Sequence, residues 1–182
     1  TVINLTNHTY FNLRGEASGS VLGEQLQLNC SKYLVTDENL TPTGEMAPVA
    51  GTPMDFTKAK TLGEDIRKPF PALVFGKGYD NCFVIDGYKK GEMALAAVLT
   101  DEVSGRTLEV LTTQPAVQIY TGNWLMGCPA TKSGNRTYFD YDGVAIECQG
   151  MPDAPNHANF PSQELDRGEQ YAQSIVFRFS TK

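Results

Sequence analysis

The side chains that could carry acid–base chemistry are few, so each can be weighed singly. The chain has 2 histidines, and histidine is the side chain that gains or loses a proton near neutral pH. His8 lies in Thr6-Asn-His-Thr-Tyr-Phe-Asn-Leu13, at the end of a predicted strand and among polar and aromatic residues. His157 follows two prolines in the run 152–157, which indicates an exposed loop. His8 is therefore the candidate acid or base, although a structural histidine fits the same surroundings.

Two predicted strands share a feature that points to a binding surface. Because side chains alternate between the faces of a strand, Ala116–Tyr120 and Val144–Gln149 each place apolar residues on one face and polar or small ones on the other. Gln118 and Glu147 stand in the middle of these polar faces. One interpretation is a sheet face washed by solvent. The other is a concave polar groove floored by Gln118 and Glu147, with alanines leaving room for a ligand.

Asp80 lies at the mouth of another predicted strand, in Gly76-Lys-Gly-Tyr-Asp-Asn81. A carboxylate there could accept hydrogen bonds from ligand hydroxyl groups, but aspartate is also a common turn residue. The glycines are weak evidence for a phosphate loop because no helix is predicted to follow them.

Tyr10 and Trp124 could offer flat faces to a sugar ring, although aromatic residues more often belong to a core.

The elements that must position these residues are predicted to be strands. Helical periodicity is nearly absent, and only Leu62–Arg67 could form a short helical turn. Without crossover helices to join parallel strands, the pattern predicts an all-β, antiparallel sandwich or barrel. The predicted strands are Val2–Leu5, Gln25–Cys30, Tyr33–Thr36, Cys82–Asp86, Met93–Thr100, Thr107–Thr113, Val117–Tyr120, Val144–Gln149 and Ser174–Phe179.

Two segments need separate comment. Asn39–Phe56 is rich in proline and glycine and too long for a hairpin turn, so it is interpreted as a loop, or as the rim of a binding site. Thr1–Leu5 resembles the middle of a strand, which suggests a fragment of a longer protein.

Composition excludes several classes of partner. The 182 residues include 15 Lys and Arg against 21 Asp and Glu, a net charge of −6, and the basic residues are scattered. We therefore expect neither nucleic acid nor an anionic membrane as a partner. No apolar run approaches the ~20 residues of a membrane helix. The 4 cysteines are far apart and form no zinc or redox motif. Reduced thiols and the lack of an export signal favour a cytoplasmic location.

Five groups of motifs follow one another along the chain: Asn4-Leu-Thr-Asn-His-Thr-Tyr-Phe-Asn-Leu13, Gly78-Tyr-Asp80, Thr113-Gln-Pro-Ala-Val-Gln-Ile-Tyr-Thr-Gly-Asn123, Gly143-Val-Ala-Ile-Glu147 with Pro152-Asp-Ala-Pro-Asn156, and Leu165-Asp-Arg-Gly-Glu-Gln-Tyr171. In this order they resemble the aldose 1-epimerase (galactose mutarotase) family. The resemblance covers residues 1–182 as one galactose mutarotase-like domain, the C-terminal portion of the family's fold. It implies a large antiparallel β-sandwich, the galactose mutarotase-like supersandwich, with a sugar cleft on its concave face.

Matched motif by motif, the resemblance implies roles for five residues. His8 corresponds to the family's general acid and Glu147 to its general base, while Asp80, Gln118 and Tyr10 correspond to sugar-contacting positions. The implied reaction interconverts the α and β anomers of aldohexoses such as galactose and glucose, with no metal or organic cofactor. The resemblance also implies an N-terminal portion, with a substrate-binding arginine and a further histidine, that this chain lacks. Either a partner piece of the same protein completes the sandwich, or the chain is a truncated product.

Three other functions compete with this hypothesis. A carbohydrate-binding fragment would keep the cleft but lack turnover. A glycosidase would use Asp80 and Glu147 as its carboxylate pair, leaving His8 without a role. A phosphosugar epimerase of related fold would require clustered Arg or Lys residues, and the motifs contain none.

Overall fold

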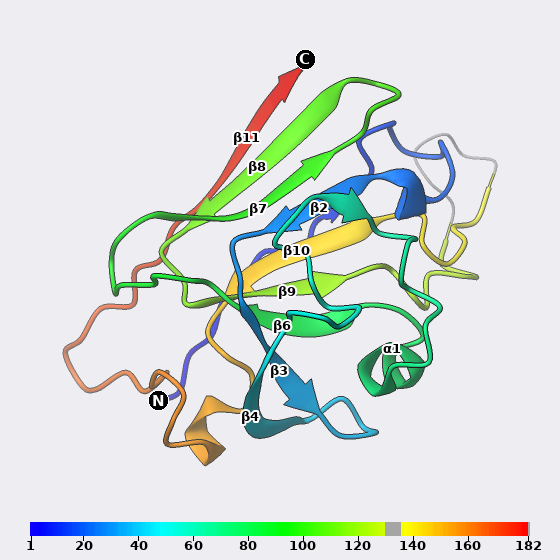
Figure 1. Cartoon of the computed structure of the whole chain (residues 1–182). Coiled ribbons are helices and arrows are strands. Elements are labelled where there is room, and N and C mark those ends of the chain that lie inside the picture. The colour runs from blue at the N-terminus through cyan, green and yellow to red at the C-terminus, as the bar shows by residue number, and fades with distance from the viewer. Residues whose placement is uncertain (130–135, 182) are drawn as a thin grey trace.

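Two antiparallel sheets make up the computed structural model, which describes residues 1–129 and 136–181. The six-stranded sheet has the order β1-β10-β9-β6-β3-β4 and the five-stranded sheet the order β11-β8-β7-β2-β5; Figure 1 shows β11, β8 and β7 above the strands of the larger sheet. The predicted all-β, antiparallel class is confirmed. The strands are β1 (Tyr10–Phe11), β2 (Gln25–Leu28), β3 (Lys32–Thr36), β4 (Pro42–Pro48), β5 (Lys60–Thr61), β6 (Asp80–Val84), β7 (Ala94–Thr100), β8 (Arg106–Thr112), β9 (Ala116–Tyr120), β10 (Val144–Gln149) and β11 (Ile175–Thr181).

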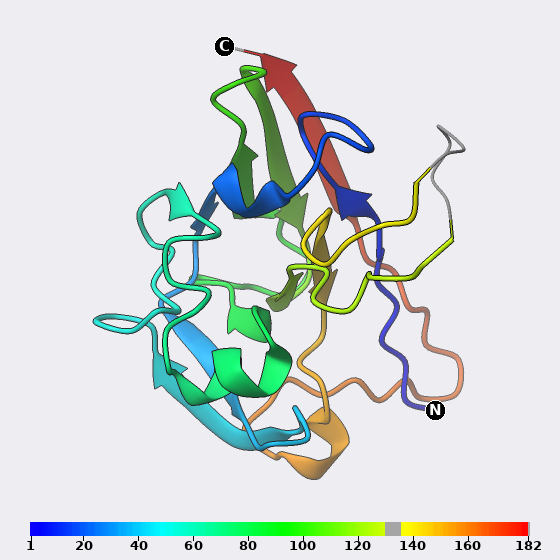
Figure 2. The ribbon, with the colours of Figure 1, turned by 90° about the vertical axis from the view of Figure 1, so that its right-hand side faces the viewer.

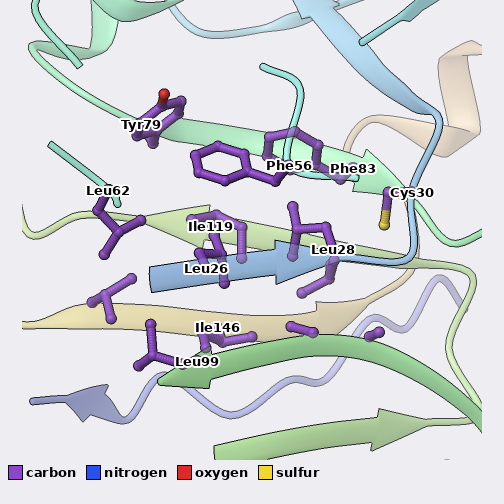
Figure 3. Close-up of a cluster of buried hydrophobic side chains, with 14 of the residues drawn as sticks. Leu26, Leu28, Cys30, Phe56, Leu62, Tyr79, Phe83, Leu99, Ile119 and Ile146 are labelled. Atoms are coloured by element: carbon purple, nitrogen blue, oxygen red, sulfur yellow. The ribbon is translucent and has the colours of Figure 1, made fainter. Parts of the chain in front are cut away.

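The core lies between the two sheets and follows from the alternation of their strands. Ile119 and Ile146 point inward from the larger sheet, and Leu26 and Leu99 meet them from the smaller one (Figure 3). Each of these side chains is 1% exposed or less. Burying a leucine or isoleucine fully contributes roughly 1.5–3 kcal/mol, so this layer fixes which face of each strand is turned outward. The outward face of the larger sheet is the one that carries the polar residues of interest.

The prediction of a strand at Val2–Leu5 is wrong. Its only β contact in the described chain is an isolated bridge between Val2 and Glu164, supported by a 3.0 Å hydrogen bond from Ile3 N to Gln163 O. The N-terminal segment therefore runs beside a coil rather than inside a sheet (Figure 2). Leu5 remains 63% exposed, so the apolar residues here are not buried as a strand pattern would require.

The interpretation of Asn39–Phe56 as a loop alone is also wrong. It contains β4 (Pro42–Pro48), which pairs with β3 at the edge of the larger sheet. Prolines at both ends of the strand hid it from the sequence pattern, because proline is confined to strand ends and edges. The start of β4 reaches the rim of the candidate site, which agrees with the alternative interpretation of this segment.

Helix in the described part of the chain is confined to short pieces. Leu62–Arg67 forms turns without a helix, and α1 (Pro71–Gly76) begins a few residues later with proline in its first turn, where the missing N–H costs nothing. The 3₁₀ turns are η1 (Val21–Gly23) and η2 (Ala154–Asn156). Within the described residues, no helix is long and apolar enough to cross a membrane.

His157 is not the exposed loop residue that the sequence predicted. It follows η2, and its side chain is only 18% exposed. Its Nε2 atom lies 3.2 Å from Pro42 O and 3.2 Å from Asp153 Oδ2, and its ring packs on Phe160. The segment around η2 thus covers the outer edge of β4, where Asn159 Nδ2 also donates to Gly44 O at 2.9 Å.

Candidate active site

Three neighbouring strands bring the predicted polar residues onto one sheet face. In the antiparallel register Gln118 of β9 stands opposite Glu147 of β10 on one side and Cys82 of β6 on the other. Asp80 lies two residues before Cys82 and therefore points to the same face. The sequence left open whether this face is washed by solvent or forms a polar groove. Glu147 is only 7% exposed, so the face is not simply washed by solvent.

These side chains line a cavity on the outer face of the larger sheet. Its volume is about 350 Å³, large enough for a small polar ligand. The predicted residues His8, Asp80, Gln118 and Glu147 all contribute to its wall. The other lining residues are Leu34, Thr36, Leu40, Pro42, Cys82, Tyr120, Gln149 and Pro152.

His8 and Glu147 face each other although they lie far apart in the sequence. His8 Nε2 is 3.6 Å from Glu147 Oε1. The histidine side chain is 52% exposed, whereas the glutamate side chain is 9% exposed. The pair thus combines a proton donor or acceptor that solvent can reach with a carboxyl group set deeper in the sheet.

Asp80 and Gln118 form a second pair in the same cavity. Gln118 Nε2 donates to Asp80 Oδ1 at 2.7 Å. This bond uses one amide hydrogen and fixes one carboxylate oxygen, while the buried Gln118 Oε1 has no partner among the described residues. A buried acceptor without a donor is costly, so a ligand hydroxyl that reached it would bind favourably.

Burial controls the electrostatics of both carboxyl groups. It raises the pKa of Glu147, and Asp80 adds to this rise while the His8 imidazole opposes it. Burial likewise raises the pKa of Asp80, opposed by the hydrogen bond from Gln118 and by His8. A carboxyl group with a raised pKa is a better proton acceptor once ionised, which suits a general base.

Of the two aromatic candidates, Tyr10 lies beside the cavity and Trp124 does not line it. Tyr10 lies beside the cavity, with its ring 5.0 Å from that of His8 and 6.0 Å from that of Tyr120. Burial raises the pKa of the Tyr10 phenol to about 12, so it stays protonated at neutral pH. Trp124 does not line the cavity; it is 61% exposed, with Lys77 Nζ above its ring.

Some lining residues were not predicted individually. Tyr120 follows Gln118 by two residues, so strand alternation alone could have placed it on this face. For Thr36 alternation gives no guide, because the pairing of β3 with β4 is irregular between Leu34 and Thr36. Leu40 and Pro42 lie in the segment interpreted as a loop or rim, and no periodic signal marks them.

No cluster of three or more metal-ligating side chains occurs in residues 1–129 and 136–181. Within the same residues the cysteines are free, and Cys30, Cys82 and Cys148 are buried.

Comparisons with known proteins identify the family of the chain. Residues 1–178 match the family model described as Aldose 1-epimerase. The chain belongs to the aldose 1-epimerase family. It is 42% identical over 180 residues to galactose mutarotase of Homo sapiens and 37% identical over 185 residues to aldose 1-epimerase of Escherichia coli (strain K12). These alignments cover 99% and 97% of this chain but 50% of each relative, so the chain spans about half the length of the curated relatives it matches.

Solved structures of family members share the fold. The aldose epimerase homologue from C. elegans superposes with a TM-score of 0.83 at 30% identity, over 99% of this chain and 52% of that one. Galactose 1-epimerase from Lactobacillus acidophilus gives a TM-score of 0.75 at 28% identity, over 99% of this chain and 49% of that one. The predicted galactose mutarotase-like fold is confirmed.

Proposed function

We propose that this chain supplies the acid–base site of an aldose 1-epimerase that interconverts the α and β anomers of aldohexoses such as galactose and glucose. The observation that carries the proposal is the approach of His8 Nε2 to Glu147 Oε1, 3.6 Å apart at one wall of the cavity. The two oxygens that exchange protons in this reaction are both bonded to the anomeric carbon. An acid and a base that serve them must therefore lie close together.

The mechanism needs one acid, one base and groups that hold the ring. Ionised Glu147 takes the proton from the C1 hydroxyl while protonated His8 gives a proton to the ring oxygen. The bond between C1 and the ring oxygen breaks, C1 becomes a carbonyl carbon, and rotation about C1–C2 presents its other face. Closure reverses both proton transfers, with neutral His8 as base and protonated Glu147 as acid. Asp80, Gln118 and Tyr10 would hold the remaining hydroxyl groups, and no cofactor takes part.

The test is polarimetry of freshly dissolved α-D-galactose, corrected for the uncatalysed rate. Glu147→Gln should lower catalysis about 10² to 10⁴-fold, the usual contribution of a positioned acid or base. Glu109→Gln is the matched control, because Glu109 lies on the other sheet in an exposed pair with Arg178. Near-normal turnover in Glu147→Gln would refute the assigned base.

A second candidate is a sugar-binding chain that has no turnover of its own. It is favoured by the half-length match to the relatives and by the 52% exposure of the His8 side chain. Isothermal titration with galactose separates the two functions. Saturable binding without mutarotation would favour this candidate, whereas mutarotation that Glu147→Gln abolishes would exclude it.

We also propose that the half of the relatives' length not matched here completes the site as a partner piece. In the described chain, β1 pairs only with β10 and β11 only with β8, so both sheets end at the same side of the sandwich. Phe11 of β1 lies there against Phe177 and Phe179 of β11, with ring centroids 5.2 and 6.3 Å away. Phe179 is 61% exposed, so an apolar surface borders the strand that follows His8.

The partner proposal is tested by complementation. The unmatched half of the E. coli aldose 1-epimerase is mixed or co-expressed with this chain, and complex formation and mutarotation are measured. Phe179→Asp should abolish association because it places a charge in the apolar contact. Exposed Val103, 75% accessible on the turn between β7 and β8, offers Val103→Asp as a control. Association unaffected by Phe179→Asp would contradict this surface.

The location that fits these features best is the cytoplasm, because the buried cysteines are free thiols. Cell fractionation with an antibody to the chain tests this.

A further inference from the structure

A buried polar network holds the backbone just before Asp80 and takes no part in the proton transfers. Thr121 and Asn123 follow β9, and both are fully buried. Asn123 Nδ2 donates to Gly76 O at 2.7 Å and to Tyr79 O at 3.0 Å, while Asn123 Oδ1 accepts from Thr121 Oγ1 at 2.5 Å. The Thr121 hydroxyl also accepts from Tyr79 N at 3.1 Å. Two side chains thus satisfy several backbone groups of the loop before β6.

The network leaves little freedom in its hydrogen bonds. Asn123 uses both amide hydrogens and its carbonyl oxygen, and the Thr121 hydroxyl acts as donor and acceptor together. A fully satisfied buried network of this kind enforces one geometry, because breaking any bond leaves a buried polar group without a partner. The loop backbone is therefore held at fixed points on both sides of Gly78.

Gly78 shows how closely the loop approaches the network. Its φ is +149°, and a Cβ atom at this position would lie 2.4 Å from Asn123 Oδ1, so only glycine fits. Lys77, just before it, adopts a left-handed conformation with φ of 58°. Tyr141 donates from its hydroxyl to Lys77 O at 2.5 Å, which holds the loop from a further direction.

Tyr79 links the network to the site, because it is held by the network and immediately precedes Asp80. Its side chain is buried in the core against Phe56 (Figure 3), and its hydroxyl donates to Pro53 O at 2.9 Å. Because adjacent residues of a strand point to opposite faces, a fixed Tyr79 directs Asp80 outward to the cavity. Gln118 then fixes one oxygen of the Asp80 carboxylate.

We propose that Thr121 and Asn123 are positioning residues that set the Asp80 carboxylate for contact with a sugar hydroxyl. This inference rests on the proposed function, in which Asp80 holds the sugar. The segments Gly76–Asp80 and Gln118–Asn123 already meet through the pairing of β6 with β9. The network adds side-chain bonds that hold the loop backbone just before Asp80. The catalytic pair His8 and Glu147 lies outside the network, so sugar affinity should suffer more than the rate of proton transfer.

The test is a double-mutant cycle read by sugar affinity and by KM and kcat. It uses the chain in the form that binds galactose, either alone or with its partner piece. Asp80→Asn should weaken binding roughly 10- to 100-fold, the loss expected for a hydrogen bond to a charged group. Thr121→Val should weaken it about threefold to tenfold with kcat nearly unchanged. In the double variant, Thr121→Val should add almost nothing to Asp80→Asn, because both act through one carboxylate.

Two further variants separate positioning from mere stability. Thr121→Ser keeps the hydroxyl and should restore most of the affinity. Thr112→Val is the matched control, since Thr112 is a fully buried threonine of β8 that accepts from Gln114 N at 3.0 Å and donates to Ser174 O at 3.0 Å. It should reduce stability without changing sugar affinity. If Thr121→Val does not fold, Tyr141→Phe perturbs the same loop more gently and takes its place in the cycle.

The outcomes are distinct. Additive losses from Thr121→Val and Asp80→Asn would overturn the positioning role while leaving the proposed sugar contact intact. No effect of Asp80→Asn on affinity would overturn both the contact and the positioning role. Loss of mutarotation with affinity retained in Glu147→Gln would still support the proposed catalytic function in either case.

Discussion

Gln118 stands directly opposite Glu147 in the pairing of β9 with β10 and donates a 2.7 Å hydrogen bond to Asp80 on the other side. One amide side chain thus lies between a buried carboxyl group, that of Glu147, and a half-buried one, that of Asp80, and both line the same cavity. Like charges in a shared site raise each other's pKa, while a hydrogen-bond donor favours the ionised form. The amide stabilises the ionised form of Asp80 without adding a charge of its own. The negative charge of Asp80 in turn raises the pKa of Glu147.

The first prediction concerns the acid limb of the pH–rate profile. Burial and the charge of Asp80 both raise the pKa of Glu147, and the base must be ionised to act. The value of kcat/KM should therefore fall as pH drops through a pKa above the ~4.3 of a free glutamate. Asp80→Asn removes one of the raising charges, so the acid limb should move to lower pH. An acid limb that stays in place or moves upward would contradict this coupling.

The second prediction concerns Tyr10. Its ring lies against His8, and burial raises the pKa of its phenol to about 12. Tyr10→Phe should therefore leave the shape of the pH–rate profile unchanged below about pH 10. If the hydroxyl contacts sugar, KM should rise by up to about tenfold, the value of one lost hydrogen bond. A changed alkaline limb in Tyr10→Phe would show instead that the phenol takes part in proton transfer.

Much of the site could be predicted from the sequence because strand alternation is local. The spacing of Gln118 and of Glu147 within their strands placed both on one face, and the structure confirms that face. Pairing between strands is not local, and no spacing reveals that Gln118 faces Glu147 and bonds to Asp80. The network of Thr121 and Asn123 was missed for the same reason, since its partners are backbone groups some forty residues away.

The errors also have physical causes. β4 was hidden by its prolines, which an edge strand tolerates because one row of its N–H groups has no partner strand. The segment Val2–Leu5 has the alternation of a strand but meets a coil. His157 looked exposed because its partner Pro42 lies 115 residues away in the sequence.

The third prediction concerns stability and Glu24, a carboxyl group remote from the site. Glu24 is 1% exposed and accepts from Leu13 N at 2.8 Å, and burial raises its pKa to about 7. Because the folded state binds this proton more tightly than the unfolded state, the group favours folding fully below pH ~4.5. That contribution, up to about 3 kcal/mol, is lost as pH rises through about 7. Unfolding in urea at several pH values should show the decline.

Glu24→Gln isolates this group because it cannot titrate. The free energy of unfolding of the native chain, minus that of the variant, should fall between pH 4.5 and 8. The raised pKa values of Asp80 and Glu147 cancel in this difference because both proteins contain them. A difference that stays constant over this range would show that Glu24 does not titrate with a raised pKa.

The fourth prediction concerns the contact between Gly44 and His157 at the edge of β4. Gly44 has φ of +90°, and a Cβ atom there would lie 2.7 Å from His157 Nδ1. Gly44→Ala should destabilise the fold by roughly 1–3 kcal/mol, from backbone strain and from this clash. In the His157→Ala background the clash disappears and only the strain remains. The cost of Gly44→Ala, measured by urea unfolding, should therefore be smaller there than in the native chain, whereas equal costs would mean that the ring moves aside freely.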